Sequence, residues 1–117
     1  MVQQKQRILV VEPDDQILGL LERWLGEAGY AVFLETAASG ADPHLVIIDV
    51  PDPHGAEKVI ASIRRTHAGA ILLLSARFRQ GMGSSSIVAR QLGVRNVLPK
   101  PFSRDELLSA VSESLES

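Results

Sequence analysis

The feature that most constrains the fold of this chain is a series of five short, mostly apolar runs. The runs lie at 8–11, 31–34, 45–48, 70–74 and 94–98. Most of them are continuously apolar rather than alternating between apolar and polar residues. Strands that are buried on both faces have this pattern, and they occur in parallel sheets covered by helices on both sides. The runs therefore predict a central, largely parallel sheet.

Helical patterns separate most of these runs. Apolar residues recur at i, i+3, i+4 and i+7 in the segment 17–28, and Gly29 follows it as a natural helix stop. A second stripe covers 56–63, a shorter third covers 87–92, and a last one covers 107–115. Ser103 and Glu106 form an S-x-x-E capping box before the last stripe. The predicted order is β-α-β-β-α-β-α-β-α.

The second and third strands have no convincing helix between them. The segment 36–44 is short and contains the sequence SGADP. A parallel crossover usually needs about a dozen residues or more. We therefore expect a loop or about one helical turn there.

Composition narrows the class of protein. The chain has 117 residues, a hydrophobic fraction of 45% and a formal net charge of −2, which is typical of one globular domain spanning 1–117. The absence of cysteine excludes a disulfide scaffold and thiolate metal sites. No apolar run approaches the roughly 20 residues that cross a bilayer. We expect a cytoplasmic domain without a membrane segment.

A polar side chain follows four of the five runs. These residues are Glu12, Asp49, Ser75 and Lys100. In open α/β sheets, sites form outside the carboxyl ends of the strands. A carboxylate beside a divalent cation and a lysine is suited to attack on a phosphoryl group, and a hydroxyl can hydrogen-bond a phosphoryl oxygen.

These pieces resemble the receiver domain of two-component response regulators along nearly the whole chain. The matching segments are ILVVE at 8–12, LVIID at 45–49 with Pro53 and Gly55, LLSA at 73–76, and LPKPF at 98–102. Each segment alone is a weak signal, but four in the right order at strand ends are a strong one. The resemblance implies a flavodoxin-like, doubly wound five-stranded parallel sheet in the order 2-1-3-4-5, with the second helix short or missing here.

The resemblance also implies a function and a site. Asp49 would accept a phosphoryl group from a histidine kinase or phosphotransfer protein, with Ser75 and Lys100 contacting the phosphoryl oxygens. Mg²⁺ would be bound by Glu12, Asp49 and the backbone carbonyl of Pro51. The Lys100–Pro101 peptide bond would be cis, which is a rare and checkable feature.

The chain departs from the family pattern at several positions. Pro13 stands where receivers usually carry a second acid, so one expected Mg²⁺ ligand is missing. Asp14 and Asp15 follow, and we favour a helix N-cap over metal ligation for them. Val97 replaces an aromatic residue that often rotates on activation. The loop 50–55 is short, and the loop 77–86 is rich in glycine and serine.

The segment 76–104 carries six basic residues and no acidic residue. We expect a downstream protein to dock on a basic face around Arg90, Arg95 and Arg104, where a homodimer could also form. Nucleic acid is a less favoured partner, because no aromatic residues interleave the charges and no helix-turn-helix fits. The three histidines lie in separate segments, and we interpret them as loop or helix-end residues: His44, His54 and His67.

Two functional hypotheses remain open. The first is a phosphorylatable switch that is not an enzyme beyond its own phosphorylation and dephosphorylation. The second is a degenerate receiver that docks to proteins independently of phosphorylation, as Pro13 and Val97 suggest. No P-loop, dinucleotide-binding loop or nucleophile elbow supports an unrelated enzyme.

Overall fold

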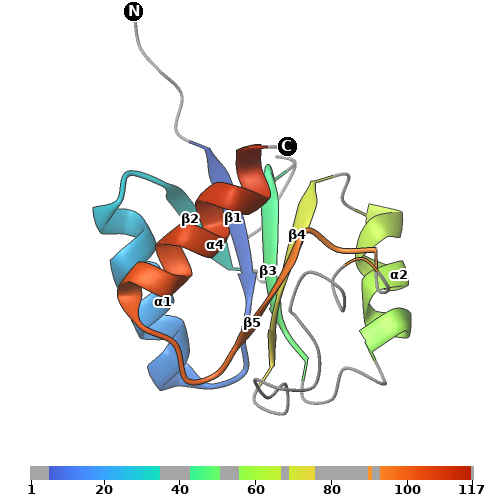
Figure 1. Ribbon diagram of the computed structural model, residues 1–117, viewed down its shortest axis with the longest axis horizontal. Coiled ribbons are helices and arrows are strands. Elements are labelled where there is room, and N and C mark those ends of the chain that lie inside the picture. Colours follow the sequence, from blue (N-terminus) through green and yellow to red (C-terminus); the bar gives the residue numbers. More distant parts are fainter. Residues whose placement is uncertain are drawn as a thin grey trace, which may run out of the picture.

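Five parallel strands form the centre of the computed structural model (Figure 1). The structure describes residues 6–34, 43–50, 56–66, 69–75, 90 and 93–116. The strands are β1 (Arg7–Val11), β2 (Ala31–Leu34), β3 (Leu45–Asp49), β4 (Ala70–Ser75) and β5 (Asn96–Pro99). Their order in the sheet is β2-β1-β3-β4-β5, and every neighbouring pair is parallel. The predicted fold class, strand number and strand order are confirmed.

Helices cover both faces of the sheet. Helices α1 (Asp15–Glu27) and α4 (Arg104–Glu116) lie on one face, and α2 (Ala56–Thr66) lies on the other (Figure 1). The predicted helix at 87–92 falls outside the described residues except for Arg90, and so does most of the compressed crossover at 36–44. The predicted loops at 50–55 and 77–86 also lie outside them, apart from Val50.

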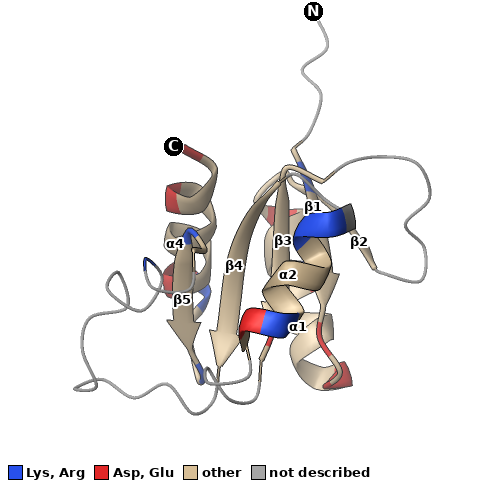
Figure 2. Ribbon diagram, turned by 90° about the vertical axis from the view of Figure 1, so that its right-hand side faces the viewer, with Lys and Arg blue, Asp and Glu red and all other residues tan. Residues whose placement is uncertain are grey.

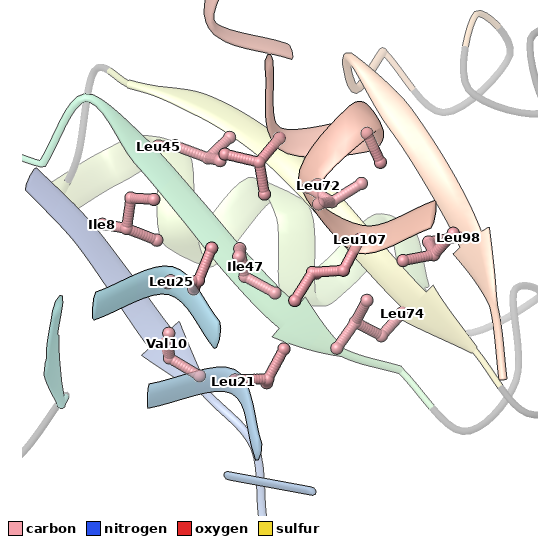
Figure 3. Packing of buried hydrophobic residues seen from close by; sticks show 12 residues of the cluster. Ile8, Val10, Leu21, Leu25, Leu45, Ile47, Leu72, Leu74, Leu98 and Leu107 are labelled. Carbon is pink, nitrogen blue, oxygen red and sulfur yellow. The ribbon is translucent and has the colours of Figure 1, made fainter. Parts of the chain in front are cut away.

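The doubly covered sheet explains why the strands are continuously apolar. Adjacent residues of a strand point to opposite faces, so each face needs its own apolar set. Ile47 belongs to the cluster under α1 and α4, whereas its neighbour Ile48 belongs to the cluster under α2. Figure 3 shows the first cluster, where α1 contributes Leu21 and Leu25.

The only tryptophan of the chain lies on α1, at the margin of this cluster. Trp24 of α1 packs against the cluster and meets Phe102 edge to face, with ring centroids 6.4 Å apart. Trp24 therefore has a packing role. The contact joins α1 to the segment that follows β5.

Helix ends are fixed by the residues that the sequence singled out. The Asp14 side chain accepts hydrogen bonds from the backbone N–H groups of Gln16 and Ile17, at 2.9 and 3.2 Å, and so caps α1. Gly29 adopts a φ of 96° just after α1, a conformation that glycine takes without strain. Ser103 and Glu106 form the reciprocal capping box at the start of α4.

The segments that enter β3 and β4 pack closely at the amino end of the sheet. His44 accepts a hydrogen bond from the Arg7 backbone N–H through Nδ1 at 2.9 Å, and its carbonyl accepts one from the Ala70 N–H at 3.1 Å. A Cβ on Gly69 would lie 2.5 Å from the Pro43 carbonyl oxygen. Among the described helices, none is long and apolar enough to cross a membrane.

Candidate phosphoacceptor site

The strand register brings the four predicted polar residues to one edge of the sheet. Val11 pairs with Ile48, Asp49 pairs with Leu74, and Ser75 pairs with Pro99. Because the strands are parallel, the residues that end them or follow them lie at the same edge. Glu12, Asp49, Ser75 and Lys100 therefore gather at the carboxyl edge of the sheet.

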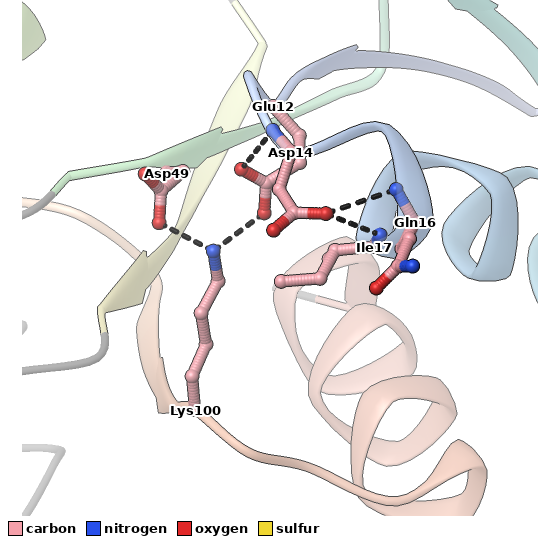
Figure 4. Close-up of polar contacts among 6 residues, drawn as sticks. All are labelled: Glu12, Asp14, Gln16, Ile17, Asp49 and Lys100. Carbon is pink, nitrogen blue, oxygen red and sulfur yellow. Dashed lines mark hydrogen bonds and ion pairs between the residues drawn. The ribbon is translucent and has the colours of Figure 1, made fainter.

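Lys100 joins the two acids into one ion-pair cluster (Figure 4). Its Nζ lies 2.5 Å from Oε1 of Glu12 and 2.6 Å from Oδ1 of Asp49. The three side chains are largely buried, with exposed fractions of 12% for Lys100, 1% for Glu12 and 11% for Asp49. Two carboxylates and one ammonium leave a formal charge of −1, so the cluster still favours a further cation.

The surroundings of Lys100 act on its pKa in opposite directions. Burial lowers the pKa by disfavouring the ammonium, and the hydrogen bonds and charges of Asp49 and Glu12 raise it. The two carboxylates outweigh burial, so the pKa of Lys100 lies above its ordinary value. Lys100 is therefore a permanent cation at neutral pH.

The backbone around Lys100 holds the side chain over the acids. The Lys100 N–H donates to the Ser75 carbonyl at 2.9 Å, which ties the segment after β5 to the end of β4. The Lys100–Pro101 peptide bond is cis, as the resemblance implied.

Glu12 is held in its buried position by the next turn of chain. Its Oε2 accepts a hydrogen bond from the Asp14 backbone N–H at 3.4 Å, while Oε1 meets Lys100. Asp14 points its own carboxylate into the first turn of α1 and serves as the N-cap. The preference for a capping role at Asp14 or Asp15 is confirmed for Asp14, and Pro13 is exposed.

Ser75 and Val97 have buried positions beside the cluster. Ser75 ends β4 with an exposed fraction of 1%, and it neighbours the strand that leads to Lys100. Val97 is 2% exposed and packs in the apolar cluster under α2. A valine at this place fills the core and has no ring to swing outward.

The donor atoms at this edge are suited to a hard cation. Mg²⁺ is usually bound by one or two carboxylates and keeps several waters. Glu12 and Asp49 supply two carboxylates that already converge on a single cation, the Lys100 ammonium. Within the described ranges, no group of three or more acids or histidines could hold a metal. The predicted third ligand, the Pro51 carbonyl, lies outside the described residues.

The remaining candidate residues are spread over both ends of the sheet. Arg90 and Arg95 precede β5, whereas Arg104 begins α4 after it, so Arg95 and Arg104 lie at opposite ends of that strand. His44 lies at the amino end of β3, and His54 and His67 fall outside the described residues. The described part of the chain therefore does not gather the three arginines at one point.

Sequence reasoning missed the direct contact of one lysine with both acids. The order of strands predicts that Glu12, Asp49 and Lys100 share an edge, but it does not predict which side chain reaches which. The replacement of a second acid by Pro13 was the available signal. With only two carboxylates at the edge, one ammonium can contact both of them.

Comparisons with known proteins identify similar sequences and folds. The chain is 32% identical to Protein PetR of Rhodobacter capsulatus over 116 residues, which is 92% of this chain and 48% of PetR. The chain thus spans about half the length of this relative. No protein-family model matches the sequence.

Solved structures share the fold. A response regulator from Thermotoga maritima superposes with a TM-score of 0.76 at 21% identity, covering 97% of this chain and 100% of that one. A BeF3-activated DrrB receiver domain superposes with a TM-score of 0.73 at 23% identity, covering 97% and 100% of the two chains.

Proposed function

We propose that this chain is a receiver domain and that it accepts a phosphoryl group on Asp49 as a switch in two-component signalling. The observation that carries the proposal is the cluster of Asp49, Lys100 and Glu12 at the carboxyl edge. In this proposal the domain is a signalling component and not an enzyme acting on a separate substrate. The donor would be a phosphohistidine of a kinase or of a phosphotransfer protein.

The proposed reaction is an in-line displacement at phosphorus. A carboxylate oxygen of Asp49 forms the new O–P bond while the N–P bond to the donor histidine breaks, and the histidine nitrogen keeps the electron pair and is protonated. Lys100 already touches Oδ1 of Asp49, so its charge lies beside the oxygens on which negative charge develops. The Ser75 hydroxyl would hydrogen-bond a phosphoryl oxygen.

The carboxylates also suit a metal in this reaction. Glu12 and Asp49 would hold Mg²⁺, together with the carbonyl of Pro51. When bound, Mg²⁺ would supply positive charge to the phosphoryl oxygens. Glu12 is buried and fixed by the Asp14 N–H, so its carboxylate is oriented before a cation arrives.

The test is labelling with acetyl phosphate in the presence of Mg²⁺, read by intact-protein mass spectrometry. The expected result is an acid-labile gain of one phosphoryl group that disappears with excess chelator. Asp49→Asn removes the nucleophile with little change in size, and its labelling should be lost. Asp15→Asn, in the first turn of α1, is the matched control and should still be labelled.

A second candidate function has a specific observation in its favour. Pro13 stands where receivers usually carry an acid, and Lys100 already forms ion pairs with both remaining carboxylates. A domain in this state could dock to proteins without phosphorylation. A folded wild-type chain that gains no phosphoryl group, beside a two-acid receiver that does, would contradict the switch and favour this docking function.

We further propose that a downstream protein docks on the basic segment 76–104, which includes Arg90, Arg95 and Arg104, or that a second copy of the chain pairs there. The support is the charge of the segment 76–104, which carries no acidic residue. An electrostatic contact of this kind weakens with salt. Reversal of Arg104 to Glu should weaken such a contact more than Arg23→Glu on α1.

A further inference from the structure

A pocket lies at the amino edge of the sheet, at the end opposite Asp49. It has a volume of about 520 Å³ and lies between the end of α2 and the start of β5. Gly69, which precedes β4, and Gly93, which precedes β5, contribute backbone to its wall. The proposed phosphoacceptor chemistry makes no use of this pocket.

Two arginines line the pocket from separate elements. Arg64 comes from the last turn of α2, and Arg95 comes from the residue before β5. Figure 2 shows basic segments at the end of α2 and at the start of β5, both at the same end of the sheet. No acidic residue belongs to the described part of the pocket wall.

Backbone contacts hold both arginines in place. The Arg64 guanidinium donates through Nη2 to the Gly93 carbonyl and so bridges α2 to the chain before β5. The Arg95 N–H donates to the Ile71 carbonyl at 3.0 Å, which fixes its backbone against β4. Val94 and Val97, on either side of Arg95 in the sequence, both pack in the cluster under α2.

We propose that this pocket binds a small molecule carrying a phosphate monoester. A guanidinium is charged at every accessible pH and presents five N–H donors in a planar fork, which is more than one carbonyl uses. Two such groups match the charge of a phosphate monoester, which approaches −2 above its second pKa of about 6. The volume falls within the range of about 300–1,000 Å³ that is typical of small-molecule sites.

The alternative is that Arg64 has no ligand and only complements the negative end of the α2 dipole. Basic residues in a last helical turn stabilise the helix dipole wherever they point. Arg65 provides the control, because it shares this turn and this charge with Arg64 but does not line the pocket. If the pocket is a binding site, substitution of Arg64 or Arg95 should weaken binding, and substitution of Arg65 should not.

The experiment is an NMR titration of the ¹⁵N-labelled chain with phenyl phosphate at constant ionic strength. The Asp49→Asn variant is used throughout, because it cannot be phosphorylated at the proposed acceptor. The outcome of this titration therefore does not depend on whether the proposed function is correct. We expect saturable shifts of the amides of Ile71, Gly93 and Arg95. Benzoate, which carries a single negative charge, should bind at least several-fold more weakly.

Variants decide the assignment. Arg64→Gln and Arg95→Gln should each weaken phenyl phosphate binding about tenfold, as expected for loss of one charge-assisted hydrogen bond. Arg65→Gln should leave the affinity unchanged. If Arg64→Gln loosens the end of α2, then Arg95→Gln still tests the site. Shifts that do not saturate, that centre on Glu12 and Lys100, or that weaken equally in Arg65→Gln would overturn the proposal.

Discussion

The two edges of the sheet carry opposite charges and hold them in different ways. At the carboxyl edge, Glu12, Asp49 and Lys100 are largely buried and touch one another. At the amino edge, Arg64 and Arg95 are exposed, and backbone carbonyls and N–H groups fix the segments that carry them. Buried charges need partners, whereas exposed charges are already solvated by water. The charges at the carboxyl edge are therefore coupled to one another, whereas Arg64 at the amino edge contacts a backbone carbonyl.

The largest expected effect is the loss of stability when Lys100 is removed from the ion-pair cluster at the carboxyl edge. Lys100→Met leaves the buried Glu12 and Asp49 carboxylates without their shared cation. We expect the free energy of unfolding at pH 7 to fall by about 3 kcal/mol, as found when one partner of a buried ion pair is removed. Urea unfolding followed by circular dichroism measures this change.

The matched change at the other edge is Arg64→Met. The arginine is exposed, and its bond to the Gly93 carbonyl can be replaced by water. We expect a loss below about 1 kcal/mol. Equal losses in the two variants would break the comparison, because they would show that burial does not separate the two edges.

A second prediction concerns the packing of backbone at the amino edge. Gly69→Ala would place a Cβ 2.5 Å from the Pro43 carbonyl oxygen and 3.0 Å from the His44 carbonyl group, so the backbone must shift. We expect a loss of about 2 kcal/mol in the free energy of unfolding, in the range for overpacking. Thermal and urea unfolding of the variant give the value.

Gly19 provides the control within α1. A Cβ there meets nothing within 4 Å, so alanine fits. Because alanine is the better helix former, Gly19→Ala should stabilise the protein by roughly 0.5–1 kcal/mol. Destabilisation by both changes would mean that neither outcome reflects the local space around the glycine.

Features that depend on local sequence pattern or on strand order could be predicted from the sequence. The five strands and their helices follow from apolar periodicity, and their parallel order follows from the resemblance. Strand ends then placed Glu12, Asp49 and Lys100 at one edge, because residues after parallel strands share an edge. The Ser103 and Glu106 capping box was also readable, since it depends on local spacing alone.

Features that depend on long-range side-chain reach could not be predicted. Lys100 and Glu12 are 88 positions apart, and their contact is set by how far the lysine extends from the segment after β5. The bridge from Arg64 to the Gly93 carbonyl is of the same kind. The topology of the sheet places Arg64 and Gly93 at the amino edge, but it does not predict that they share a pocket with Arg95.

A third prediction separates capping from metal binding at the carboxyl edge. Asp14→Ala removes the acceptor that satisfies the N–H groups of Gln16 and Ile17, and it should cost about 1 kcal/mol of stability. Asp14→Ser keeps a capping oxygen and should restore most of that loss. Both variants should keep the labelling by acetyl phosphate and its dependence on Mg²⁺. If both folded variants lost labelling, Asp14 would belong to the metal site.

The smallest expected effect is a dependence of stability on alkaline pH. The pKa of Lys100 lies above its ordinary value in the folded state, because the carboxylates of Asp49 and Glu12 outweigh the opposing effect of burial. A raised folded pKa contributes stability that is fully present below the unfolded pKa of about 10.4, and that is lost as the pH rises through the folded pKa. Above pH 10, the wild-type chain should therefore lose stability more steeply than Lys100→Met, as measured by urea unfolding at a series of pH values. Arg64→Met should keep the wild-type slope, since an arginine does not titrate in this range. An equal loss of stability in wild type and Lys100→Met above pH 10 would contradict this prediction. It would show that other lysines and tyrosine cause the loss, and that Lys100 does not contribute to it.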